Sequence, residues 1–172
     1  MNNKNWVIKA FLLTFFICIL ISGLSNTIAS NANIWILVFI TIIIILVGII
    51  FDIIGTAVLT ADEATFHAKA SNKIRGSKES IHLIKNASNI ANFCNDIIGD
   101  ICGIVSGSMG AMIAITLANR FSFNPTIAAL IVSSIISSIM VGGKAIGKNI
   151  AVKKSDSIIF RVGKLINHTK KN

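Results

Sequence analysis

Charged residues are scarce in this chain. Only 13% of its 172 residues are charged, whereas 53% are hydrophobic, and the mean hydropathy is +0.78. A soluble domain of similar size normally carries about a quarter charged residues. The composition therefore excludes an ordinary soluble domain and predicts an integral membrane protein.

Paired cysteines and catalytic motifs are also lacking. The cysteines have no spacing typical of a disulfide framework or a zinc site. All three lie in apolar segments, where we interpret them as small buried hydrophobic side chains: Cys18, Cys94 and Cys102. The sequence contains no nucleophile–base spacing and no glycine-rich phosphate loop. We therefore do not expect an enzyme.

Acidic residues are outnumbered by basic ones, which gives a net charge of +9. The basic residues fall in the gaps between apolar runs rather than on one continuous face. This distribution favours a membrane-topology signal over a nucleic-acid interface. We therefore expect the lipid bilayer, and no nucleic acid, as a partner.

Four apolar runs indicate an all-α integral membrane protein with three to four transmembrane helices. The runs cover residues 6–24, 34–59, 92–118 and 126–141. The first is either a membrane helix or a signal peptide cleaved near Thr27-Ile28-Ala29. We divide the chain into a transmembrane helix with a short external loop, a transmembrane core and a basic amphipathic tail: residues 1–33, 34–151 and 152–172.

A basic juxtamembrane segment, residues 60–91, separates the second and third runs. Its isoleucines recur at helix-like intervals among charged residues. The pattern indicates either one or two amphipathic helices at the interface, broken near Gly76, or a solvated helical loop. Because positive loops stay cytoplasmic, we place this segment and the C-terminus on the cytoplasmic side of a plasma or inner membrane.

Two carboxylates lie inside the third run. In an α-helix, Asp96 and Asp100 are one turn apart on the same face. A charge at membrane depth is costly unless it faces a partner, water or an ion. We therefore take residues 92–103 as the candidate functional centre.

Hydroxyl-bearing and small residues continue this polar character. In the fourth run Ser134 and Ser138 are one turn apart, where their hydroxyls either face an ion or bond the preceding turn of backbone. The small residues between Gly103 and Ala114 suit close helix contact, either between two copies or within one.

Three motifs stand in the order of a known membrane domain. Thr56 and Thr60-Ala61-Asp62-Glu63 occupy the place of a serine-rich motif, and Asn95-Asp96 or Gly99-Asp100 that of an Asn-Asn motif. Residues 143–151 look like its G-E-I-L-P-K-T-L-A motif. Through these positions the chain resembles the membrane domain of the CNNM/CorC (CorB) magnesium-transport family, also called DUF21.

The resemblance implies a homodimer that transports Mg²⁺. The chain departs from the family in having Lys144 in place of a glutamate and Gly147 in place of a proline. The CBS domains that many members carry are not in this sequence.

We therefore hypothesise a divalent-cation transporter, or its core, with Mg²⁺ as the transported ion. The expected ligands are oxygen donors: Asp96, Asp100, Thr56, Thr60, Asn95, Ser134 and Ser138. The alternative is a non-transporting scaffold or regulatory subunit in which Lys144 and one of the two aspartates form an internal ion pair.

Overall fold

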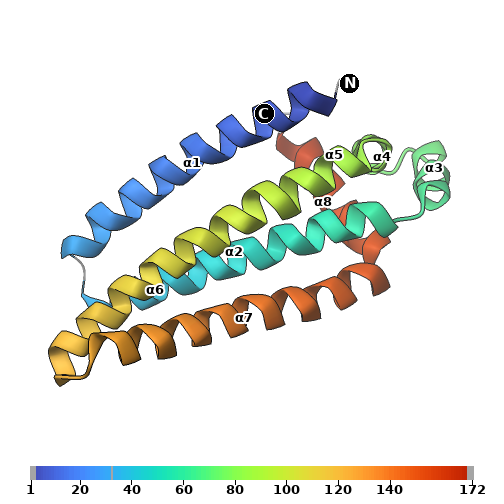
Figure 1. Cartoon of the computed structure of the whole chain (residues 1–172). Coiled ribbons are helices and arrows are strands. Elements are labelled where there is room, and N and C mark those ends of the chain that lie inside the picture. Colours follow the sequence, from blue (N-terminus) through green and yellow to red (C-terminus); the bar gives the residue numbers. More distant parts are fainter. Residues whose placement is uncertain (1–2, 32, 170–172) are drawn as a thin grey trace. The chain divides into compact units, whose positions relative to one another are not determined.

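The computed structural model describes residues 3–31 and 33–169, which are almost entirely helical. No strand occurs in these ranges, so the predicted all-α fold is confirmed (Figure 1). In chain order the elements are α1 (Asn3–Asn31), α2 (Ile34–Thr60), α3 (Glu63–Ser71), α4 (Ser77–Lys85), α5 (Ala87–Asn92), the π-helix η1 (Phe93–Gly99), α6 (Asp100–Phe121), α7 (Pro125–Lys153) and α8 (Ser155–Thr169).

Three helical stretches of the described residues are long and apolar enough to cross a membrane. They are Ile34–Thr60, Ala87–Phe121 and Pro125–Lys153. The part of α1 that is comparably apolar is shorter, Phe11–Gly23. Three candidate spans are thus present, and a fourth stays a prediction.

The last apolar helix is longer than the sequence suggested. We expected it to end near Val141, but α7 continues well into the basic region. Gly143 and Gly147 lie inside the helix, and their bare backbones pack on Ile49 and Ile53 of α2. Small residues permit this close helix contact, which explains why the glycines do not end α7.

The chain divides into two compact units. Unit 1 comprises residues 1–48 and 97–142, and unit 2 comprises residues 49–96 and 143–172. Each contains a part of α2 and α7, and each has its own buried core.

Unit 1 is built on the contact of α1 with α6 (Figure 1). Its core consists of apolar side chains from α2, η1 and α6: Leu37, Ile97, Ile101, Val105, Met109 and Ile113. On the small-residue face of α6, Gly110 lies against Ile136 of α7. This part of the face is therefore used within the chain, and the homodimer implied by the family resemblance stays a prediction.

Unit 2 contains the basic juxtamembrane helices. The chain turns between α3 and α4 at Gly76, whose φ of 88° lies in the left-handed region that glycine adopts without a steric penalty. This arrangement confirms the predicted break near Gly76, which separates α3 from α4, and the location of these helices at a membrane interface stays a prediction. The unit's core draws on α2, α3, α5, α7 and α8: Ala57, Val58, Phe66, Ala91, Ala151 and Ile159.

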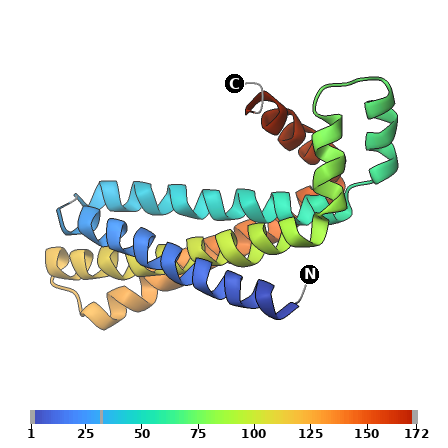
Figure 2. The ribbon, with the colours of Figure 1, turned by 90° about the horizontal axis from the view of Figure 1, so that it is seen from above.

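The basic tail forms α8, which packs against α4 (Figure 2). Ser80 of α4 donates its hydroxyl to the carbonyl of Ile159, with the oxygens 3.2 Å apart. The Asn167 side-chain amide donates to the Glu79 carboxylate over 2.7 Å. These two bonds fix the register of α8 on α4.

The close contact between α8 and α4 allows the effect of adding one methyl group to α8 to be predicted. Alanine in place of a helical glycine normally adds up to about 1 kcal/mol of stability. At Gly163, however, a Cβ atom would lie 2.5 Å from the carbonyl oxygen of Gly76. We expect Gly163→Ala to destabilise unit 2 by about 1–3 kcal/mol and to lower the melting temperature of the detergent-solubilised protein.

Gly107 offers the matched control because it is helical and a Cβ there meets nothing within 4 Å. Gly107→Ala should leave the melting temperature unchanged or raise it. An equal rise in both variants would contradict the close approach of α8 to α4.

Candidate functional site

Asp52 is the buried carboxylate of unit 2. It lies on α2, its residue is only 3% exposed, and its Oδ2 atom has no hydrogen-bond partner among the described residues. The side chain sits in an apolar run that is long enough to span a membrane. Such a group needs a compensating charge, because an uncompensated carboxylate in a low-dielectric environment is strongly unfavourable.

Lys148 of α7 brings a positive charge to Asp52. Its Nζ atom lies 4.0 Å from Asp52 Oδ2, and its side chain is 56% exposed. The separation is too long for a hydrogen bond, so this is an electrostatic contact that leaves the Oδ2 lone pairs available. The packing of Gly147 on Ile53 brings α7 close to this part of α2.

A second buried oxygen lies beside the same turn of α2. Asn95 of η1 packs its side-chain amide directly on the backbone of Gly55. Its Oδ1 atom is buried and has no hydrogen-bond partner in the part of the chain that the structure describes. Gly55 follows Asp52 by three residues, which places the two on one side of the helix. A larger residue at position 55 would displace Asn95.

This arrangement defines the unit 2 polar site, which consists of Asp52, Thr56, Asn95 and Lys148. A carboxylate and an amide supply hard oxygen acceptors around one turn of α2, and Thr56 adds a hydroxyl one turn after Asp52. Oxygen donors of these kinds are the ligands that Mg²⁺ and Ca²⁺ take in proteins. Donors of these kinds suit a cation, and the Lys148 ammonium lies beside the carboxylate.

The predicted ligands fall in different parts of the molecule. Thr56, Thr60, Asn95 and Asp96 belong to unit 2, as does Lys144, whereas Asp100, Ser134 and Ser138 belong to unit 1. Asp96 and Asp100 are both exposed. Within the described residues no three His, Cys, Asp or Glu side chains gather as a metal-binding group.

Two of the predicted hydroxyl ligands donate to carbonyls of their own helices. Thr60 donates its hydroxyl to the Thr56 carbonyl over 3.1 Å, and Ser138 donates to the Ser134 carbonyl over 2.7 Å. These bonds are the common use of Ser and Thr inside a helix. Ser134 and Ser138 are also exposed, so their role as ion ligands stays a prediction.

The π-helix changes the geometry of the stretch we took as the functional centre. Asp96 lies in η1 and Asp100 begins α6. A π-helix bonds residues five apart, so its turn is wider than the α-helical turn that we assumed. Such widened turns occur mostly as short insertions within α-helices and are frequent at functional sites, and this one contains Asn95, which packs on α2.

Asp52 and Lys148 are the residues that the sequence reading missed. Asp52 was visible as a lone carboxylate in a long apolar run, the same signal that drew attention to Asp96 and Asp100. Lys148 could not be distinguished from Lys144, because the expected helix ended before both. The pairing of Lys144 with Asp96 or Asp100 stays a prediction.

The contact between Asp52 and Lys148 is open to a direct test. In a double-mutant cycle with Asp52→Asn and Lys148→Met, we expect a coupling of about 0.5–1 kcal/mol in detergent unfolding. This coupling energy lies at the low end of the usual range, because solvent screens the charge of the half-exposed lysine.

Lys153→Met provides the control cycle, since Lys153 is an exposed lysine at the end of the same helix. It should show no coupling to Asp52→Asn. Equal coupling in both cycles would mean that Asp52 responds to the general positive field rather than to Lys148.

Comparisons with protein-family models, with curated proteins and with solved structures found no match.

Proposed function

We propose that this chain is a multi-pass membrane protein that binds and transports a divalent cation, with Mg²⁺ as the first candidate. The observation that carries the proposal is a pair of buried oxygen atoms, Asp52 Oδ2 and Asn95 Oδ1, which have no hydrogen-bond partner among the described residues. Unpaired buried acceptors are costly, and a bound cation would satisfy both.

The chemistry of the site suits a partly hydrated ion. Mg²⁺ demands near-octahedral geometry and keeps several of its waters, so a protein needs to supply only a few oxygen ligands. Asp52 would provide the charge, Asn95 a neutral carbonyl oxygen and Thr56 a hydroxyl. The remaining coordination positions of the ion would be filled by water that enters from the polar end of α2, at Thr60.

The sequence resemblance adds independent support. Thr56 and Asn95 belong to two of the motifs through which the chain resembles the CNNM/CorC membrane domain. Asp52, which those motifs do not include, would be the third ligand. The proposed ligand set therefore retains Thr56 and Asn95, adds Asp52, and leaves out the other predicted ligands: Asp96, Asp100, Thr60, Ser134 and Ser138.

Lys148 has a definite role in this mechanism. Its ammonium compensates the Asp52 carboxylate when no ion is bound. An incoming divalent cation must displace that ammonium, because two cations near one carboxylate repel each other. The long lysine side chain can withdraw toward water without any movement of the helix.

A non-transporting scaffold is the second candidate, and the same contact favours it. If Lys148 is the permanent partner of Asp52, the pair makes both charges tolerable in an apolar layer. The polar site would then serve folding and not transport.

Magnesium flux into proteoliposomes, followed with an enclosed Mg²⁺-sensitive dye, separates the candidates. Wild-type protein should carry Mg²⁺, and Asp52→Asn and Asn95→Leu should each lower the flux by about 10-fold or more. That figure is the lower limit for supporting residues at metal sites, and direct ligands should exceed it.

Asp96→Asn is the matched control, because it removes an exposed carboxylate of the same unit. It should retain nearly all of the flux. Absence of wild-type flux, together with a marked loss of stability in Lys148→Met, would establish the scaffold and refute transport. Flux that depends on Asp96 and Asp100 but not on Asp52 would place the ligands where the sequence alone suggested.

A further inference from the structure

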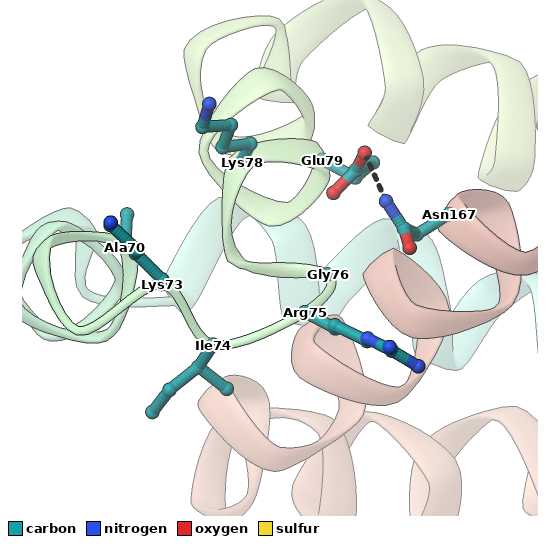
Figure 3. A pocket seen from close by; sticks show the side chains of 8 residues that line it. All are labelled: Ala70, Lys73, Ile74, Arg75, Gly76, Lys78, Glu79 and Asn167. Carbon is teal, nitrogen blue, oxygen red and sulfur yellow. Dashed lines mark hydrogen bonds between the residues drawn. The ribbon is translucent and has the colours of Figure 1, made fainter.

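A basic pocket lies where the chain turns between α3 and α4, within unit 2. Its volume is about 300 Å³, and Figure 3 shows the residues that line it. They come from the end of α3, the turn, the start of α4 and α8: Ala70, Lys73, Ile74, Arg75, Gly76, Lys78, Glu79 and Asn167. None of them belongs to the unit 2 polar site, so the pocket requires its own explanation.

The lining carries an excess of positive charge. Lys73, Arg75 and Lys78 contribute three cations, and Glu79 is the one acid of the lining. In Figure 3 the Glu79 carboxylate points to Asn167, whose amide donates to it over 2.7 Å. Figure 3 also shows Lys73 and Lys78 on the other side of Gly76 from this pair. The pocket thus offers cations to a ligand while its acid is engaged with α8.

Apolar side chains border the cations. Ile74 lines the pocket and is 42% exposed. A neighbouring hollow of about 340 Å³ shares Lys78 and Glu79 and is also lined by His82, Leu83 and Ile166. Cations beside exposed aliphatic side chains are typical of helices that lie at a membrane interface, where headgroups meet acyl chains.

We propose that this pocket binds the phosphate group of an anionic phospholipid. Lys73 and Lys78 supply the charge at the phosphate, and Arg75, whose side chain extends on the other side of Gly76 in Figure 3, adds to the positive field of the turn. The apolar part of the lipid lies over Ile74, Leu83 and Ile166. A soluble phosphate would use the cations but gain nothing from these aliphatic side chains, which is why the lipid is the favoured source.

A lipid bound in this pocket would have a structural role. The lining of the pocket joins α3, α4 and α8, so a lipid bound there would hold the turn at Gly76 and the α8 helix to the membrane surface. The proposal does not depend on cation transport, because no residue of the unit 2 polar site takes part.

The test uses the purified full chain in mixed micelles, with binding measured by lipid titration. The probes are phosphatidylglycerol, phosphatidylcholine and inorganic phosphate. We expect saturable binding of phosphatidylglycerol and about 10-fold or greater weakening in the double variant Lys73→Gln/Lys78→Gln, since each lysine contributes about a factor of five at an anionic surface.

Lys153→Gln/Lys154→Gln is the matched control, because it removes two exposed lysines of the same unit that lie outside the pocket. It should weaken binding by less than about 2-fold if the pocket is specific. Equal weakening by the two double variants would overturn the proposal in favour of general attraction to a charged surface. Competition by inorganic phosphate at the same concentration as the lipid would identify a soluble-phosphate site and would also overturn it.

A double variant that preserves the charge serves as the control for misfolding. Lys73→Arg/Lys78→Arg should bind phosphatidylglycerol within about 2-fold of wild type. Failure of this variant, with an unchanged melting temperature, would mean that the shape around the lysines and not their charge controls binding, and it would refute a phosphate contact.

Discussion

The cost of placing a carboxylate in an apolar helix governs the arrangement of unit 2. Asp52 is buried in a run of α2 that has almost no other polar group, so the surrounding helices must supply compensation. Lys148 does so at close range, with its Nζ atom 4.0 Å from the carboxylate, and Asn95 packs beside the same turn of α2 on Gly55. Glycines on α2 and α7 allow this approach, because larger residues at positions 55 and 147 would hold the neighbouring side chains away.

The same constraint explains why most hydroxyls of the apolar helices are poor ion ligands. A Ser or Thr inside a membrane span gains a bond by donating to the carbonyl one turn earlier, as Thr41, Thr60, Ser106 and Ser138 do. A hydroxyl that is engaged in this way adds no charge and needs no partner. A buried carboxylate has no equivalent local solution, since its acceptors find no free amide within a helix.

The sequence allowed the helical class, three candidate spans, the break near Gly76 and the amphipathic tail to be predicted, because each depends on local pattern. Hydropathy identifies a span, and the charged stretch around Lys73 and Lys78 cannot cross a membrane. The predicted end of α7 was wrong, because Gly143 and Gly147 look like helix breakers until their packing on α2 is known. The π-helix that positions Asn95 was equally invisible, since a widened turn follows from tertiary packing and not from residue propensity.

The position of Lys148 bears on how a cation would enter. The exposed lysine holds a positive charge beside Asp52 without occupying the hydrogen-bonding positions of the carboxylate. Under the proposed function, an arriving ion would exchange with an ammonium and would not meet a bare negative charge. Such an exchange would keep the charge of the site more nearly constant in both states, which would lower the cost of each step in a low-dielectric layer. In the scaffold alternative the same ammonium never leaves, so the mobility of Lys148 is what separates the two functions.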